Sequence, residues 1–303
     1  MSEPPATSAA RRAPPAPTRI GPATFTWGAR TYVMGILNLT PDSFSADGLL
    51  PASGDDGEAD PVARAVAQAR AMVAAGADLL DIGGESTRPG HATVDSDTER
   101  ARVVPVIAAI RAALPDIPVS IDTTKPVVAE AALAAGADLL NDVWGTGPDD
   151  GMARVAAANG VPLIVMHNRA EPRYRALVPE VIADLERALE RAVALGVPEG
   201  DLLVDPGIGF GKDADQNVAL LGALDALTSL GRPVLLGTSR KSTLGRILDL
   251  PVDQRLEATL ATTALGIAAG VDLVRVHDVE ANVRAARVSD AIVRGTWTSG
   301  SAT

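Results

Sequence analysis

The segment Ala74-Ala-Gly-Ala-Asp-Leu-Leu80 contains, in seven residues, the end of an expected helix, a turn and the beginning of an expected strand. Gly76 stands where helices commonly end in a left-handed residue, and Leu79 begins a short apolar run. The pattern recurs as Ala134-Ala-Gly-Ala-Asp-Leu-Leu140 and, more loosely, as Ala268-Ala-Gly-Val-Asp-Leu-Val274. A repeated helix–turn–strand unit is typical of right-handed β-α-β crossovers, which place parallel strands side by side.

Short apolar runs of this kind, each ending in a polar or glycine-rich cluster, occur along the whole chain. They cover residues 32–38, 78–85, 118–122, 138–142, 162–167, 202–205, 233–239 and 272–277. Between them lie stretches long enough for helices, such as 64–75 and 256–269. Eight strands alternating with helices predict an α/β fold of the (β/α)8 type, a TIM barrel, whose active site is built where the strands end.

The 303 residues suit a single barrel domain with extensions. We expect the barrel to span residues 23–294. Residues 1–22 are rich in Pro, Ala and Ser and predict a disordered N-terminal tail, and residues 295–303 predict a polar C-terminal tail. Two long connections after strands, 39–60 and 86–95, have the length of functional loops.

The composition limits the classes of partner. A net charge of −11 argues against nucleic acid and anionic membranes, so an anionic substrate must be held by local positive charge. The absence of cysteine excludes disulfides and thiolate metal sites. No apolar stretch approaches the roughly 20 residues of a membrane span. Because residues 1–22 lack the apolar core of a secretory signal, we expect a cytoplasmic location by default.

Two carboxylates end apolar runs that should be buried. Asp122 and Asp205 must find hydrogen-bond donors there or have a raised pKa. Each also has a structural interpretation, since Asp122 could cap the helix beginning at Pro126 and Asp205 could be a turn residue. With Asn141, which ends another run, they would form an acceptor-rich floor suited to a flat heterocycle with several N–H donors.

Basic residues follow the last two runs. Ser239-Arg-Lys-Ser242 should open a helix, where a cation beside free N–H groups favours an anion. Arg275 and His277 alternate on one strand face, and the last two loops of such barrels commonly bind phosphate. The alternative is a solvated salt-bridge cluster with Asp278 and Glu280.

Two further features have simpler explanations than a ligand site. Gly207-Ile-Gly-Phe-Gly-Lys212 fits neither the phosphate-loop nor the dinucleotide pattern, which favours glycines that allow a sharp turn or a close backbone approach. His167 has no metal-ligand partners at suitable spacing, which favours a hydrogen-bonded histidine over a zinc ligand.

Together these segments resemble the dihydropteroate synthase family, over residues 32 to about 291. The motifs that carry the resemblance are modest alone but specific in this order at successive strand ends. They are Met34-Gly-Ile-Leu-Asn-Leu-Thr-Pro-Asp-Ser-Phe-Ser45, Asp81-Ile-Gly-Gly-Glu-Ser-Thr-Arg-Pro-Gly90, Ser120-Ile-Asp-Thr123, Asn141-Asp-Val143, Asp205-Pro-Gly-Ile-Gly-Phe-Gly-Lys212, Ser239-Arg-Lys241 and Arg275-Val-His-Asp-Val279.

The resemblance implies a transferase of folate biosynthesis that condenses 6-hydroxymethyl-7,8-dihydropterin pyrophosphate with 4-aminobenzoate and releases pyrophosphate. It also implies Mg²⁺, a dissociative mechanism, a homodimer and inhibition by sulfonamides. Two rival functions are a pterin-binding methyltransferase and a non-catalytic pterin-binding homologue. The methyltransferase would share the Asp/Asn floor but would have no need of pyrophosphate-binding cations.

The resemblance also assigns roles to residues. The residues that would bind the pterin are Asp122, Asn141, Met166, Asp205 and Lys241. Those that would bind pyrophosphate are Asn38, Arg275 and His277, and Asn38 would also contact Mg²⁺. Those that would bind 4-aminobenzoate or form the two loops are Phe44, Thr87, Arg88, Pro89, Phe210, Lys241 and Ser242. Asp122, Lys241, Arg275 and His277 are the implied catalytic residues. The chain departs from the family pattern at Ala46, which puts the role of Asp47 in the first loop in doubt.

Overall fold

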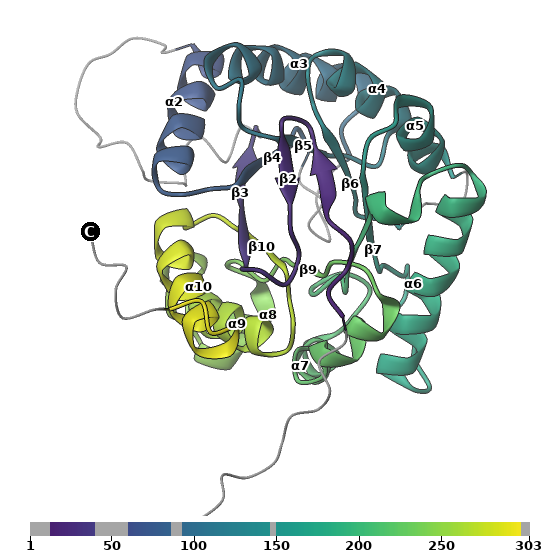
Figure 1. Ribbon diagram of the computed structural model, residues 1–303, viewed down its shortest axis with the longest axis vertical. Coiled ribbons are helices and arrows are strands. Elements are labelled where there is room, and N and C mark those ends of the chain that lie inside the picture. The colour runs from purple at the N-terminus through teal and green to yellow at the C-terminus, as the bar shows by residue number, and fades with distance from the viewer. Residues whose placement is uncertain (1–12, 40–59, 86–92, 146–149, 298–303) are drawn as a thin grey trace, which may run out of the picture.

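The computed structural model describes residues 13–39, 60–85, 93–145 and 150–297 (Figure 1). One sheet of eight parallel strands has the order β8-β7-β6-β5-β4-β3-β10-β9. The strands are β3 (Tyr32–Asn38), β4 (Leu79–Gly83), β5 (Val119–Asp122), β6 (Leu139–Asp142), β7 (Leu163–Met166), β8 (Leu202–Asp205), β9 (Leu235–Leu236) and β10 (Leu273–Val276). A parallel bridge between Val204 and Val234 joins β8 to β9 and completes the ring. The predicted TIM barrel is confirmed.

Helices surround this ring of strands (Figure 1). They are α2 (Pro61–Ala74), α3 (Ser96–Ala113), α4 (Pro126–Ala134), α5 (Gly151–Asn159), α6 (Leu177–Ala194), α7 (Ala214–Leu221), α8 (Ser242–Leu248), α9 (Leu256–Ala268) and α10 (Val279–Val293), with short 3-10 turns η1 (Glu199–Asp201), η2 (Leu224–Leu230) and η3 (Val252–Gln254). The turn predicted after α2 is present, since Gly76 has a φ of +99°. No helix in these ranges is both long and apolar enough to cross a membrane.

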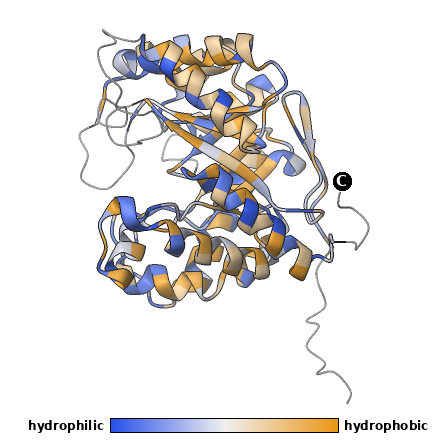
Figure 2. Cartoon of the chain, turned by 90° about the vertical axis from the view of Figure 1, so that its left-hand side faces the viewer, coloured by the Kyte–Doolittle hydropathy of each residue, from blue (hydrophilic) through white to orange (hydrophobic). Residues whose placement is uncertain are grey.

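Alternate residues of each strand face opposite sides of the sheet, and this alternation separates two cores. One set, including Val33, Leu80 and Val274, packs against the helices. The other set, including Met34, Leu79 and Leu273, forms a second cluster inside the barrel. Figure 2 shows pale and orange strands between helices in which hydrophobic and hydrophilic residues are mixed. Of the predicted site residues, six belong to the inward-facing set, farther along the strands: Asn38, Asp122, Asn141, Met166, Asp205 and Arg275.

Ordered structure is present before the predicted boundary at residue 23. Thr18–Ile20 (β1) and Ala23–Phe25 (β2) form an antiparallel hairpin, so the tail predicted over residues 1–22 ends before residue 18. Phe25 and Trp27 are buried in the inner cluster, with ring centroids 5.5 Å apart. The hairpin therefore plugs the end of the barrel opposite the predicted site. The Pro- and Ala-rich composition concealed the short alternation around Ile20, whose side chain is buried.

Candidate active site

The register of the strands places the predicted polar residues side by side at the carboxyl ends of β3 to β6. Asn38 pairs in register with Gly83, Gly83 with Asp122, and Asp122 with Asn141. A Cβ at Gly83 would lie 3.6 Å from Oδ1 of Asn38 and 3.8 Å from Cβ of Asp122, so these two side chains flank the glycine. Four neighbouring strands thus supply one continuous polar rim at the barrel mouth.

Arg275 crosses the barrel mouth to two carboxylates. Its Nε donates to Oδ2 of Asp81 at 2.5 Å, and its Nη2 donates to Oδ2 of Asp122 at 2.7 Å. Burial alone would lower the pKa of Arg275, but the two carboxylates outweigh it and raise that pKa. Burial raises the pKa of Asp122 to about 7, although Arg275 opposes the rise. Arg275 is therefore a fixed cation, and the capping role considered for Asp122 is wrong: α4 has no side-chain cap.

Asp81 determines which way Asn141 presents its amide. Nδ2 of Asn141 donates to Oδ2 of Asp81 at 3.1 Å. A carboxylate can only accept hydrogen bonds, so the amide nitrogen must face Asp81 and the amide oxygen remains an acceptor for another group. Asp81 is fully buried, on the inward face of β4. It was not among the predicted site residues.

Several acceptors at this level lack donors. Among the described residues, Oδ1 of Asp122, Oδ1 of Asp81 and Oγ of Ser120 are buried without a hydrogen-bond partner. A buried polar atom left unpaired costs about 1–3 kcal/mol. A flat ligand that carries N–H groups to this floor would recover that free energy, which agrees with the sequence-based expectation of a donor-rich heterocycle.

Asp205 serves both purposes considered for it. Oδ1 accepts from the backbone N–H of Gly207 at 2.6 Å, which makes it a turn residue. Oδ2 lies 3.7 Å from where a Cβ of Gly237 would stand, at the end of β9. Burial raises the pKa of Asp205 despite that backbone hydrogen bond and the nearby lysines. Met166 pairs in register with Asp205, so both belong to the same rim.

The cations predicted near the last two strands separate into two groups. Arg240 pairs with Asp278, with Nη2 and Oδ1 2.7 Å apart, so the salt-bridge interpretation holds for this residue. Lys241 instead places its Nζ 4.1 Å from the ring centroid of Phe210. Two residues predicted to bind 4-aminobenzoate and pterin are thereby in contact.

Ser239 contacts both the backbone and the ring of His277. The backbone N–H of His277 donates to Oγ of Ser239 at 3.1 Å, and that oxygen lies 2.9 Å from Nδ1. With the hydroxyl donating to Nδ1, a neutral imidazole carries its proton on Nε2 and can donate it to an oxyanion. Ser239 is a second residue that the site prediction omitted, although the motif contained it.

Most of the predicted site residues come together in this structure. Seven share the inward rim: Asn38, Asp122, Asn141, Met166, Asp205, Arg275 and His277. Phe210 and Lys241 meet beside it, and Ser242 begins α8. Phe44, Thr87, Arg88 and Pro89 lie outside the described residues, as does the altered loop position Ala46.

Comparison with known proteins identifies the class. The model of the pterin binding enzyme family matches residues 34–277, most of the chain. The dihydropteroate synthase of Clostridium beijerinckii is 48% identical over 277 residues, which are 91% of this chain and 99% of that protein. The dihydropteroate synthase of Bacillus subtilis is 46% identical over 272 residues, 90% and 92% of the two chains. The class that fold and sequence define is that of the pterin binding enzymes.

Solved structures show which pterin binding enzymes this chain resembles. A dihydropteroate synthase from Clostridium difficile, crystallised with pteroic acid, has a TM-score of 0.83 and 48% identity, covering 89% of this chain and 99% of that one. The Xanthomonas albilineans enzyme, in complex with 7,8-dihydropteroate, has a TM-score of 0.78 and 40% identity, covering 89% and 95%. The chain belongs to the dihydropteroate synthases and is a transferase.

Proposed function

We propose that the chain condenses 6-hydroxymethyl-7,8-dihydropterin pyrophosphate with 4-aminobenzoate by a dissociative route. The observation that carries the proposal is the Asp81–Arg275–Asp122 arrangement, with unpaired acceptors beside a fixed cation. The acceptors suit the N–H groups of a pterin, and the cation suits its pyrophosphate.

The floor would bind the pterin through its hydrogen-bonding edges. The carboxylate of Asp205 and the amide oxygen of Asn141 are acceptors for the aminopyrimidine N–H groups. Met166 supplies an apolar surface at the same level, where it is almost wholly buried. These contacts would hold the pterin with its methylene carbon toward Arg275 and His277.

Departure of pyrophosphate needs positive charge at the leaving group. Arg275 stays protonated, and His277 with a proton on Nε2 can donate to a phosphate oxygen. When C–O cleavage leaves a positive methylene conjugated with the pterin, the Asp122 carboxylate would stabilise that charge. The neutral amine of 4-aminobenzoate then attacks the carbon and loses a proton, so the site requires no strong general base.

Mg²⁺ would assist the leaving group by neutralising pyrophosphate charge. Asn38 fits this role because its amide oxygen is of the ligand type that Mg²⁺ prefers. No cluster of three or more acidic, His or Cys side chains suited to a metal occurs in the described ranges. The protein would therefore hold Mg²⁺ through Asn38 while the pyrophosphate oxygens supply further ligands.

Three expectations go beyond the reaction itself: the oligomeric state, inhibition by sulfonamides and the location. A homodimer is supported by exposed apolar residues on two helices packed against each other, Leu265 on α9 and Val288 and Ile292 on α10, which are 68%, 61% and 79% exposed. Sedimentation of wild type and of Leu265→Glu would test it, because a charge in that interface should yield monomers. Sulfonamide inhibition and a cytoplasmic location remain predictions.

The decisive experiment measures pyrophosphate release from the pterin pyrophosphate and Mg²⁺, with and without 4-aminobenzoate. Release that depends on 4-aminobenzoate and yields 7,8-dihydropteroate supports the proposal. Pterin binding without turnover would favour the non-catalytic homologue. Methyl transfer from methyltetrahydrofolate, with no pyrophosphate release, would favour the methyltransferase, although the cations around Arg275 argue against it.

A further inference from the structure

The loop after β8 is held by a lysine that the proposed chemistry does not use. Nζ of Lys212 donates to the carbonyl oxygens of Gly207 and Phe210, each at 3.0 Å, and lies 2.8 Å from Nδ1 of His167. Burial lowers the pKa of Lys212 to about 7, and in its protonated form the amino group has three N–H donors and no acceptor. All three donors of Lys212 therefore have acceptors, and two of these acceptors belong to the loop itself.

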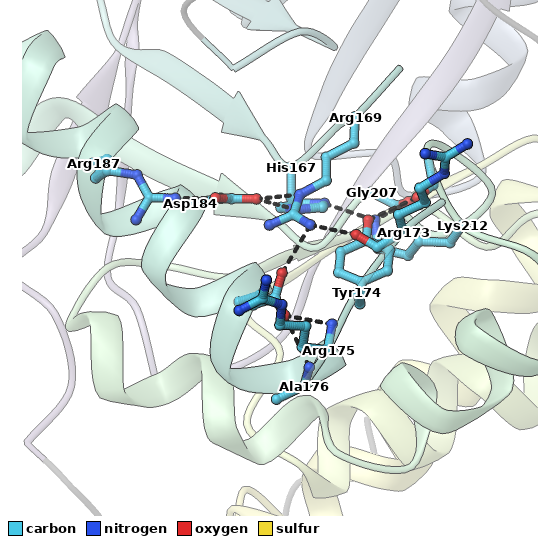
Figure 3. Close-up of polar contacts among 12 residues, drawn as sticks. His167, Arg169, Arg173, Tyr174, Arg175, Ala176, Asp184, Arg187, Gly207 and Lys212 are labelled. Atoms are coloured by element: carbon cyan, nitrogen blue, oxygen red, sulfur yellow. Dashed lines mark hydrogen bonds and ion pairs between the residues drawn. The ribbon is translucent and has the colours of Figure 1, made fainter. Parts of the chain in front are cut away.

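His167 is in turn oriented from helix α6. Its Nε2 lies 3.1 Å from Oδ2 of Asp184, which also accepts from Nε of Arg169 at 2.7 Å (Figure 3). Because Nδ1 accepts from Lys212, the imidazole is neutral and donates its Nε2 proton to Asp184. Burial and the neighbouring Lys212 lower the pKa of His167 to about 4, which agrees with a neutral ring.

The loop and the His167 segment fit closely because of a glycine. Gly207 has a φ of +66°, and a Cβ there would lie 1.9 Å from the carbonyl oxygen of His167. Two more polar groups of the loop are held: Asn217 accepts from Gly209 N–H at 2.7 Å, and Tyr174 donates to Gly211 O at 2.7 Å. The loop is thus bound at several points, and Lys212 is the side chain that binds the backbone of Phe210.

Phe210 connects this support to the active site. Its carbonyl oxygen is bound by Lys212, and its ring lies under Nζ of Lys241 at 4.1 Å from the centroid. A cation over an aromatic face is attracted by the negative face of the ring, so the ring favours a defined position for Nζ of Lys241. A continuous series of contacts therefore runs from Asp184 through His167 and Lys212 to Phe210 and Lys241.

We propose that Lys212, oriented by His167, is the positioning residue that holds Phe210 and Lys241 for 4-aminobenzoate. The inference rests on the proposed function, because it assigns these two residues to the second substrate. Lys212 touches no substrate and acts through the loop it binds. Its loss should therefore weaken 4-aminobenzoate binding more than pterin binding, because Asp122 and Asn141 stand on β5 and β6, and Asp205 ends β8 itself and lies before the loop.

Steady-state kinetics of Lys212→Met can separate these effects. The substitution keeps the length of the side chain and removes all three donors. We expect the KM for 4-aminobenzoate to rise about tenfold or more, as for a lost charge-assisted hydrogen bond, while the KM for pterin pyrophosphate changes less than about twofold. Arg187→Met is the matched control: Arg187 pairs with the far oxygen of Asp184 and is largely exposed, so both KM values should remain near wild type.

Two His167 variants test the link without removing the lysine. In His167→Asn the amide oxygen can replace Nδ1 as the acceptor for Lys212, whereas in His167→Gln the amide nitrogen can replace Nε2 as the donor to Asp184. The Gln variant should raise the KM for 4-aminobenzoate more than the Asn variant does. This comparison keeps the proposal testable if Lys212→Met does not fold.

An unchanged KM for 4-aminobenzoate in Lys212→Met, or an equal rise in both KM values, would overturn the proposal. Equal effects of the two His167 variants would also contradict it. Failure of the proposed function would look different, because the wild-type chain itself would then form no dihydropteroate.

Discussion

Asp122 receives a hydrogen bond from Arg275 on one oxygen, while its other oxygen is buried without a partner among the residues that the structure describes. The two residues are 153 positions apart in the chain and stand on β5 and β10. Arg275 fixes the carboxylate, so the unpaired oxygen is presented to a ligand in a defined direction. In the proposed reaction, Asp122 contacts the pterin and Arg275 contacts the pyrophosphate that leaves it.

Asp122→Asn should reduce turnover strongly. Arg275 offers only donors, so the amide oxygen would face Arg275 and the NH₂ group would replace the acceptor that Asp122 presents. Loss of a preorganised charge at the developing cation typically lowers kcat by roughly 100-fold or more. Product formation under saturating substrates measures the effect, with Asp253→Asn on η3 as an exposed control expected to match wild type. Near-wild-type turnover in Asp122→Asn would remove this residue from the mechanism.

Asp81→Asn should weaken pterin binding although Asp81 is not an expected pterin contact. Arg275 offers only donors, so the amide oxygen at 81 would stay in the place of Oδ2, and Asn141 would donate to a neutral oxygen instead of a carboxylate, which weakens the hydrogen bond that orients its amide. We expect the Kd for the pterin to rise about tenfold, the effect of one hydrogen bond to a charged group. Calorimetric titration would measure this rise.

A double variant gives the control for Asp81. If Asp81 acts through Asn141, Asp81→Asn should add little to the loss already caused by Asn141→Ala, because coupled residues are not additive. Fully additive losses would show that Asp81 acts on the pterin independently of Asn141.

The barrel and much of its site could be predicted from the sequence because both depend on local patterns. Each strand lies within a short apolar run that is buried on both faces, and Asn141 and Asp205 mark strand ends. Asp81 was not predicted as a site residue because it lies inside its apolar run and not at the end of it. Its partner Arg275 is 194 residues away in the sequence, across the barrel. Only the closed ring shows that both side chains face inward.

The remaining differences also arise from contacts between distant segments. The hairpin strands β1 and β2 have three residues each, too few to show a reliable pattern, and are held by tertiary packing of Trp27. His167 was correctly predicted to be hydrogen-bonded, but its partner Lys212 is 45 residues away and belongs to a loop whose fold depends on glycine geometry. Local spacing contains no information about such pairs.

Lys125→Met should destabilise the fold. Nζ of Lys125 binds Oε2 of Glu99 at 2.6 Å and also pairs with Glu85, while Glu99 is fully buried. Removing one partner of a buried ion pair leaves an uncompensated charge, which costs about 3–5 kcal/mol. Denaturant unfolding would measure the loss. Lys125→Met combined with Glu99→Gln should recover part of it, and equal stabilities of the single and double variants would contradict this account.

His167 should make stability depend on pH below neutrality. The pKa of His167 is about 4 in the folded chain, compared with 6.5 for an unburied histidine. Between pH 4 and pH 6.5 the unfolded chain therefore binds more protons than the folded chain. The stabilising effect of the neutral ring is therefore complete above pH 6.5 and is lost as the pH falls toward 4. A shift of this size corresponds to at most about 3 kcal/mol.

Asp122 acts in the opposite direction over the same interval, and a variant is needed to separate the two. Burial raises the pKa of Asp122 to about 7, so the folded chain binds the additional proton and stability increases as the pH falls. The dependence of wild-type stability on pH would therefore understate the contribution of His167.

The variant His167→Gln isolates that contribution. Its free energy of unfolding, measured with denaturant from pH 4 to 7, is subtracted from that of wild type. We expect the stability of wild type relative to this variant to decrease as the pH falls from 6.5 to 4. A difference independent of pH would show that His167 titrates in the folded chain as it does in water.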